Sequence, residues 1–281
     1  MPFIGYHECV RRLNAQTREG HAIIGVGAGT GISAKFAERG GADIIIIYSS
    51  GRFRMAGRAS TSGRMPFGDA NAIVVDMARE VLPVVRDTPV LAGVCGTDPF
   101  RMMRVFLPEL KRMGFDGVQN FPTVGLYEGS FRQTLEESEM GLEREVALIA
   151  QAHALEMLTC PYVFDEESAI RFTQAGADVI VPHLSTTVGG STGIRESAVV
   201  SLDEAVDRVQ AMHDAAKSVN PDVIVLCHGG PIATPADAAY VLERTHGVAG
   251  FFGASSIERL ATETAIETQA RRFKALRLPA R

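Results

Sequence analysis

Short apolar segments alternate with helix-like segments along the whole chain. Each helix-like segment has apolar residues at helical spacing, whereas the apolar segments are nearly continuously hydrophobic, as in parallel strands covered on both faces. The apolar segments are residues 22–26, 43–48, 90–95, 117–120, 157–160, 179–182, 223–227 and 250–252. The helix-like segments are residues 32–39, 70–82, 100–113, 142–155, 166–175, 202–218, 235–244 and 257–276. The pattern predicts eight strand–helix units.

Several of these units begin with the same short motif. Gly40-Gly41-Ala42-Asp43 and Ala175-Gly176-Ala177-Asp178 each precede a predicted strand, and Met113-Gly114-Phe115-Asp116 is a variant. A glycine just past a helix is the expected C-cap. The repetition indicates a barrel built by duplication rather than a Rossmann sheet. We therefore expect an α/β fold, with one (β/α)₈ TIM-barrel domain over residues 1–281 and an extra helix before about Gly20.

The composition restricts the classes of partner. Lys plus Arg is 28 and Asp plus Glu is 33, so the net charge is 28 − 33 = −5. A general nucleic-acid binder usually needs a basic surface, so no nucleic-acid partner is expected. The N-terminus lacks the pattern of a signal peptide, and no apolar run reaches the length of a membrane span. We expect a cytoplasmic protein with four reduced, mostly buried cysteines: Cys9, Cys95, Cys160 and Cys227.

The last two predicted strands end in small residues that suit an anion site. In barrels, the loops after the last two strands often bind phosphate together with a short helix N-terminus. Glycines let backbone N–H groups approach an anion closely. The expected anion-binding residues here are Gly229, Gly230, Gly253, Ala254 and Ser255.

Glycines also follow the first predicted strand, in Gly27-Ala28-Gly29-Thr30-Gly31. A dinucleotide site would need an acidic residue at the end of the second strand, where Tyr48-Ser49-Ser50-Gly51 stands instead. We expect no nucleotide cofactor, and Gly27 and Gly29 to supply backbone donors at the barrel mouth. The four lysines all fall in predicted helices, so neither a Schiff-base lysine nor a PLP lysine is expected on a strand.

Residues 49–68 are predicted to form a long loop across the mouth. Arg52 and Arg54 in this loop are expected to hold a phosphate or carboxylate, although a solvated loop or a subunit contact is an equal alternative. Asp98, after the third strand, is a candidate base or metal ligand, or else the cap of the next helix. Asn120, at the end of the fourth strand, is a candidate to orient a carbonyl or a carboxylate, or a structural amide.

Two histidines stand at the ends of neighbouring strands. His183 follows the sixth predicted strand and His228 the seventh. Histidine acts as acid, base or metal ligand near neutral pH, so we expect His183, His228 and Asp98 to be the catalytic residues. Three metal ligands from these strands are the alternative.

Nearly the whole chain resembles the phosphoenolpyruvate hydrolase-like family, also called TIM-barrel signal transduction proteins. It is also similar to the C-terminal half of plant tobamovirus-resistance proteins. The matching stretches are residues 27–58, 76–100, 114–126, 223–235 and 250–260, the last two reading VIVLCHGGPIATP and GFFGASSIERL. The resemblance implies a relation to phosphonopyruvate hydrolase, which cleaves a C–P bond with Mg²⁺, and implies a homo-oligomer. Those enzymes carry several acidic strand ends, whereas here only Asp98 is clearly placed.

The sequence therefore leads to two functional hypotheses. The first is a hydrolase or lyase acting on a small phosphorylated or phosphonylated carboxylate, such as phosphonopyruvate or phosphoenolpyruvate, with Mg²⁺ or another divalent metal on Asp98. The second is a regulatory barrel that binds such an anion without turning it over. A metal-dependent aldolase is a third possibility. The predicted partners are a small anionic substrate and further copies of the chain.

Overall fold

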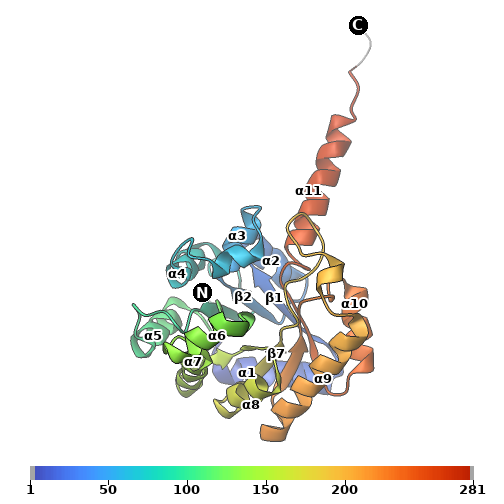
Figure 1. The fold of residues 1–281 in the computed structure, drawn as a ribbon. Helices are drawn as coiled ribbons and strands as arrows, with labels where there is room; N and C mark the ends of the chain where they lie inside the picture. Colours follow the sequence, from blue (N-terminus) through green and yellow to red (C-terminus); the bar gives the residue numbers. More distant parts are fainter. Residues whose placement is uncertain (1–3, 279–281) are drawn as a thin grey trace.

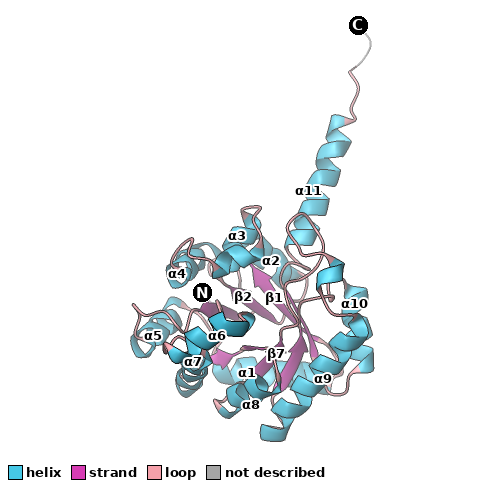
Figure 2. Cartoon of the chain, viewed as in Figure 1, coloured by secondary structure: helices cyan, strands magenta, loops and turns pink. Residues whose placement is uncertain are grey.

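Nine short parallel strands form the centre of the molecule and helices surround them (Figures 1 and 2). The structure is a computed structural model that describes residues 4–278, except for the side chain of Ala198. The strands are β1 (Ile23–Ala28), β2 (Ile44–Ile47), β3 (Val90–Val94), β4 (Gly117–Asn120), β5 (Leu158–Thr159), β6 (Tyr162–Val163), β7 (Val179–Pro182), β8 (Ile224–Cys227) and β9 (Gly250–Gly253).

The strands pair in the order β5-β4-β3-β2-β1-β9-β8-β7-β6. The two ends of this order, β5 and β6, are separated along the chain by only Cys160 and Pro161. The sequence predicts one strand here, over residues 157–160. Two form instead because Pro161 has no N–H to donate to a neighbouring strand. Its carbonyl still accepts a hydrogen bond from Val181 N at 2.9 Å.

Helices follow the predicted units closely, with two additions. Neither α3 nor α6 is predicted, and three short 3₁₀ helices also form: η1 (Ser60–Arg64), η2 (Val124–Leu126) and η3 (Glu196–Ala198). The helices are α1 (Tyr6–Arg18), α2 (Gly31–Arg39), α3 (Ser49–Met55), α4 (Ala70–Val81), α5 (Met103–Met113), α6 (Gly129–Glu137), α7 (Leu142–Ala154), α8 (Glu166–Gln174), α9 (Leu202–Val219), α10 (Pro235–Arg244) and α11 (Arg259–Lys274). Within residues 4–278, none of the helices combines the length and apolarity needed to cross a membrane.

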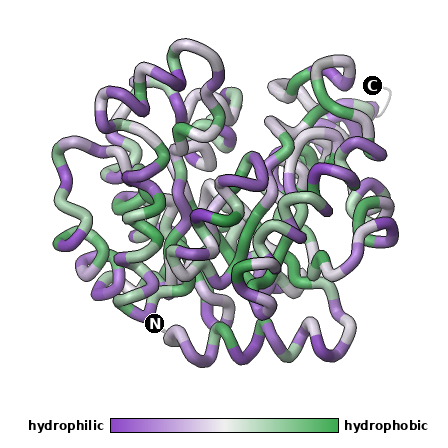
Figure 3. The backbone as a smooth tube through the Cα atoms, turned by 60° about the horizontal axis from the view of Figure 1, so that its bottom comes forward, coloured by the Kyte–Doolittle hydropathy of each residue, from purple (hydrophilic) through white to green (hydrophobic). Residues whose placement is uncertain are grey.

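The strands separate two hydrophobic cores. Successive side chains of a strand point to opposite faces. Ile44 and Ile46 of β2 accordingly join an inner cluster, whereas Ile45 and Ile47 join an outer cluster packed against the helices. Figure 3 shows the hydrophobic strands in the interior and hydrophilic segments on the helices around them. The continuous hydrophobicity of the predicted strands is explained by this burial on both faces.

The extra N-terminal helix is confirmed as α1, and it covers the start of the strands. Cys9 and Leu13 are buried and belong to the inner cluster. The start of α1 is fixed by two aspartates of the repeated motif. Asp116 accepts hydrogen bonds from the N–H groups of Ile4 and Gly5, at 2.9 and 3.2 Å, and Asp178 accepts one from the Tyr6 hydroxyl at 2.8 Å.

The repeated motif has the same structural role each time. Its glycines Gly41, Gly114 and Gly176 have φ angles of 91°, 106° and 91°, a conformation that favours glycine. The aspartate that ends each motif then accepts from a backbone N–H of the preceding strand. These contacts are Asp43 to Ile24 N at 2.8 Å, Asp116 to Val90 N at 3.1 Å and Asp178 to Thr159 N at 2.9 Å.

Candidate functional site

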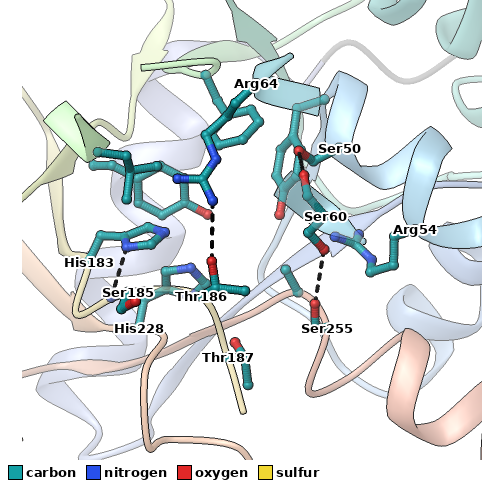
Figure 4. A pocket seen from close by; sticks show the side chains of 15 residues that line it. Ser50, Arg54, Ser60, Arg64, His183, Ser185, Thr186, Thr187, His228 and Ser255 are labelled. Atoms are coloured by element: carbon teal, nitrogen blue, oxygen red, sulfur yellow. Dashed lines mark hydrogen bonds between the residues drawn. The ribbon is translucent and has the colours of Figure 1, made fainter. Parts of the chain in front are cut away.

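A small pocket, open to solvent, lies at the carboxyl ends of the strands (Figure 4). Its walls come from the segments after β2, β4, β7, β8 and β9, where parallel α/β folds of this kind place their sites. Hydroxyl-bearing, aromatic and basic residues line it, together with two aliphatic residues. They are Tyr48, Ser50, Arg54, Ser60, Arg64, Phe121, Leu126, Tyr162, His183, Ser185, Thr186, Thr187, His228, Ala254 and Ser255.

The structure brings the two predicted histidines together. His183 and His228 pair as an isolated bridge between neighbouring segments, and their ring centroids are 4.8 Å apart. The ring of Tyr162 stacks on His228, with centroids 5.0 Å apart. Both histidines therefore lie in one aromatic wall of the pocket.

Hydrogen bonds determine which ring nitrogen carries the proton. His228 Nδ1 lies 2.7 Å from the carbonyl oxygen of Phe252. Because a carbonyl only accepts, Nδ1 donates, which leaves a lone pair on Nε2 of the neutral ring. His183 Nδ1 instead accepts from Ser185 N at 3.2 Å, so its neutral ring carries the proton on Nε2. One histidine is thus prepared to accept a proton and the other to donate a hydrogen bond.

Burial keeps both histidines uncharged. It lowers the pKa of His228 to about 4, while the hydrogen bond to Phe252 acts in the opposite direction. Burial, with His228 and Arg64 nearby, lowers the pKa of His183 well below its usual value. At neutral pH the histidines therefore add no positive charge to the pocket.

Arg54 is a predicted site residue, and it lies in the pocket wall as part of a buried ion pair. Its Nε donates to Glu258 Oε2 at 2.7 Å, and its Nη2 contacts the same oxygen and donates to the carbonyl of Gly27. Both side chains of the pair are at least 98% buried, with exposures of 1% and 2%. The charge of Arg54 is therefore neutralised within the protein.

Arg64 has no such partner. It lies in residues 49–68, where the sequence points to Arg52 and Arg54 as the anion-binding residues instead. Its guanidinium donates to Thr186 Oγ1 at 3.2 Å, and no carboxylate of the described chain lies within 4.0 Å of it. In Figure 4 it reaches into the pocket between His183 on one side and Ser50 and Ser60 on the other. Burial lowers the pKa of Arg64.

The turn after β9 forms part of the pocket wall. Ala254 and Ser255 line the pocket. Among residues 4–278, no hydrogen bond uses the N–H of either residue. The Ser255 hydroxyl shares a hydrogen bond of 3.2 Å with that of Ser60. The N–H groups of Ala254 and Ser255 thus have no partner within the described residues.

The other predicted glycines serve the fold. A Cβ on Gly29 would lie 2.1 Å from the carbonyl oxygen of Gly51, so this position lets α3 pass close to the first loop. The N–H of Gly29 donates to Glu258 at 2.6 Å. Gly27 gives its carbonyl to Arg54, and a Cβ there would meet the Tyr48 hydroxyl at 2.6 Å. None of these glycines lines the pocket.

The glycines after β8 and at the end of β9 also shape turns. Gly229 and Gly230 have φ angles of 81° and 56°, and the N–H of Gly230 donates to the Ser185 carbonyl at 2.9 Å. A Cβ on Gly253 would lie 2.6 Å from Ile257. These residues position His228 and the turn that follows β9, and they are absent from the pocket lining.

Three other predicted residues lie outside the pocket. Arg52 is 40% exposed and pairs with Asp76 at 3.1 Å. The segment that carries it, residues 49–68, is predicted as a loop but contains α3 and η1, and α3 buries Ser49, Ser50, Gly51 and Arg54.

Asp98 is bound by Asn71 at 2.8 Å, by Arg101 at 2.5 Å and by the N–H of Phe100 at 2.9 Å. It does not cap the next helix, which begins at Met103 after Met102.

Asn120 is fully buried and structural in its contacts. Its amide oxygen accepts from Tyr162 N at 2.7 Å, and its Nδ2 donates to Glu145 at 2.7 Å. Glu145 also accepts from Thr123 and from Val124 N, at 2.7 Å each. Burial raises the pKa of Glu145 to about 7. This network joins α7 to the ends of β4 and β6.

The residues that line the pocket do not fit a divalent metal. Mg²⁺ binds oxygen ligands and usually at least one carboxylate, but Asp and Glu are absent from the lining. The carboxylates of Glu258, Asp98 and Glu145 are all occupied by protein donors. No group of three His, Cys, Asp or Glu side chains suited to a metal occurs within the described residues.

A parallel α/β protein with a polar pocket at its strand ends is the class that this fold and site define. The chain belongs to the phosphoenolpyruvate hydrolase-like family, whose model matches residues 8–276. It is 57% identical over 267 residues to the ToMV susceptible protein tm-1(GCR26) of Solanum lycopersicum, and equally to the ToMV resistance protein Tm-1(GCR237). The match covers 95% of this chain but only 35% of each relative, so the chain spans about a third of their length.

Solved structures of low sequence identity share the fold. Phosphoenolpyruvate phosphomutase from Streptomyces platensis subsp. rosaceus has a TM-score of 0.60 at 17% identity, over 94% of this chain and 87% of that one. A phosphonopyruvate hydrolase in complex with oxalate and Mg²⁺ has a TM-score of 0.55 at 19% identity, over 97% and 92%. The fold of the chain is thus similar to the folds of these two enzymes.

Proposed function

We propose that the pocket is the active site of a hydrolase or lyase for a small phosphorylated or phosphonylated carboxylate, such as phosphonopyruvate or phosphoenolpyruvate. The observation that carries the proposal is the combination of an uncompensated guanidinium, Arg64, with the Nε2 lone pair of His228 in one pocket. The first attracts an anion and the second accepts a proton. Fold neighbours whose names include phosphonopyruvate hydrolase support the substrate class.

In this proposal the chain's own residues divide the work. Arg64 and the N–H groups of Ala254 and Ser255 hold the anionic groups. His228 takes a proton from the attacking water or from the substrate, since its ring is neutral at neutral pH. His183 donates a hydrogen bond from Nε2. The aromatic wall with Tyr162 limits water around the reacting atoms. Because the lining does not fit a divalent metal, no step is assigned to one.

The strand arrangement supports this position for the site. We propose that β5 and β6 are one strand of a closed eight-stranded barrel within a single domain, interrupted at Pro161. Cys160 N still donates to Val118 of β4, and the Pro161 carbonyl accepts from Val181 of β7. The segment therefore bonds to both neighbours, and the pocket lies at the mouth of the barrel.

The proposal is tested by measuring phosphate release from phosphonopyruvate and phosphoenolpyruvate, in Mg²⁺, in Mn²⁺ and in EDTA. His228→Gln should lower turnover about 10²- to 10⁴-fold, the usual contribution of an acid–base residue. The matched control is His7→Gln, because His7 is 84% exposed on α1. No release from either substrate under any of these conditions would contradict the proposed reaction.

A second function is favoured by one observation: the pocket lining has basic and hydroxyl groups that can bind an anion, and it has no acidic residue. A regulatory protein that binds an anion needs no more than this. Binding of oxalate without turnover of either substrate would support this second function.

We further propose a cytoplasmic homo-oligomer. The four free cysteines suit a reducing compartment. The helix α11 projects away from the body in Figure 1, and a second copy of the chain is the partner that we propose for it.

A further inference from the structure

The charges around the pocket do not balance, and this bears on how an anion is held. Two arginines line the pocket and no carboxylate does. Arg54 is neutralised by Glu258, with a contact of 2.5 Å. Arg64 has no acidic partner in the described chain, and both histidines are neutral. The pocket therefore carries one net positive charge.

Arg64 is positioned for a ligand rather than for the solvent. Its backbone carbonyl accepts from the Tyr127 hydroxyl at 2.9 Å. The preceding residue, Gly63, lies so close to Ser50 that a Cβ added to it would be 2.2 Å from Ser50 Oγ. These contacts fix the backbone from which the side chain extends. Of its five N–H donors, one is used, by Thr186. The remaining donors form a planar fork suited to a carboxylate or a phosphonate.

A second group of donors lies across the pocket from Arg64, at the turn after β9. The N–H groups of Ala254 and Ser255 have no partner in the described part of the chain. Ser60 and Ser255 add hydroxyls beside them. Figure 4 shows Arg64 and Ser255 on different sides of the pocket. Such an arrangement suits a ligand with two anionic ends.

We infer that the pocket binds a small dianion, a dicarboxylate or a carboxylate–phosphonate, directly on protein groups, with Arg64 in the place of a bound divalent cation. The inference rests on the proposed function in so far as the pocket is the ligand site, and it deepens that function by naming how the substrate is held. It sets this chain apart from the fold neighbour solved with oxalate and Mg²⁺. The chemical reason is the donor set, in which a guanidinium replaces carboxylates.

The test uses oxalate as the probe and isothermal titration calorimetry on the full chain. The affinity of the wild-type protein should be the same within about twofold in excess EDTA and in excess MgCl₂, since no cation bridges ligand and protein. Arg64→Gln should weaken binding about tenfold to a hundredfold, the effect of losing a charge-assisted pair of hydrogen bonds. Arg64→Lys should fall between, because lysine keeps the charge and loses the fork.

The matched control is Arg58→Gln, an exposed arginine of the same segment, which should bind as the wild type does. Binding that requires Mg²⁺, equal losses in Arg64→Gln and Arg58→Gln, or no binding in either buffer would overturn the inference. If Arg64→Gln does not fold, as judged by circular dichroism, the buffer comparison and Arg64→Lys still decide. Metal-independent binding without turnover would contradict only the enzymatic function. Turnover of a substrate, together with oxalate binding that requires Mg²⁺, would contradict only this inference.

Discussion

At the scale of single residues, the neutral histidine His228 has a consequence for stability. Its pKa is lowered to about 4 in the folded protein, against 6.5 for an ordinary histidine, chiefly because the ring is buried. Between these values the unfolded chain binds a proton that the native chain does not. The neutral His228 therefore does not reduce the free energy of unfolding above about pH 6.5, and that free energy falls as the pH decreases from 6.5 towards 4.

We predict that this residue alone lowers the free energy of unfolding by about 3 kcal/mol over that range. Urea unfolding measured across it should show a shallower fall for His228→Gln than for the wild type. His7→Gln, on the exposed surface of α1, should keep the wild-type slope. Parallel pH profiles for His228→Gln and the wild type would disprove the assignment.

The residue scale also shows what the sequence could and could not reveal about the site. Position along the chain was enough to predict five of the residues that line the pocket. Four of them follow strands, and the fifth lies in residues 49–68: His183, His228, Ala254, Ser255 and Arg54.

Arg64 could not be distinguished from Arg52 by sequence, because the choice depends on which arginine lacks an acidic neighbour. Gly29 has the composition of an anion loop, but its small size serves a backbone crossing with Gly51. Both distinctions depend on contacts between distant residues.

At the scale of elements, hydrophobic pattern predicts the strands and most helices because burial on both faces of a parallel strand leaves a continuous apolar run. The pattern does not predict α3, where Ser49, Ser50 and Gly51 are buried. The small residues of this helix pack closely against the loop after β1, where Gly51 meets Gly29. Its seven residues therefore do not show the apolar spacing of an amphipathic helix. Nor does the pattern predict the division of one strand at Pro161.

The helix α1 provides a test of packing at this scale. Leu13 is 2% exposed and joins the inner cluster beneath the strands. We predict that Leu13→Ala lowers the free energy of unfolding by about 2–5 kcal/mol, through lost burial and a cavity. The side chain of Arg11 on the same helix is 67% exposed, so Arg11→Ala should lower the free energy of unfolding by less than about 1 kcal/mol. Equal losses in urea unfolding would show that α1 does not close the inner core.

At the scale of the whole molecule, α11 is the element that the rest of the chain does not explain. Seven other strand ends lead into helices that pack on the body, but α11 buries only Arg259 among its 16 residues. Ile266 and Phe273 are each 65% exposed and stand seven residues apart, so they share one face. Exposed apolar residues at helical spacing mark a surface for a protein partner.

The body carries a matching uncovered surface. Ile32 and Phe36 lie four residues apart on α2, at exposures of 67% and 55%. The helix α2 follows β1, and β1 pairs with β9, the strand that precedes α11. Two copies would each bury an apolar helix face and an apolar body surface if they exchanged α11. A symmetric dimer satisfies both surfaces with the same contact made twice.

We therefore predict that Ile266→Lys combined with Phe273→Lys converts the proposed oligomer into a monomer, measured by sedimentation velocity, because two charges are placed in the face that we propose to be buried. The control Thr268→Lys adds a charge to the opposite face of α11 and should leave the oligomer intact, since that face remains in solvent. Circular dichroism should show that both variants are folded. A wild-type chain that sediments as a monomer, or a double variant that remains associated, would contradict the role proposed for α11. A monomeric variant that still binds oxalate would show in addition that the pocket is complete within one chain.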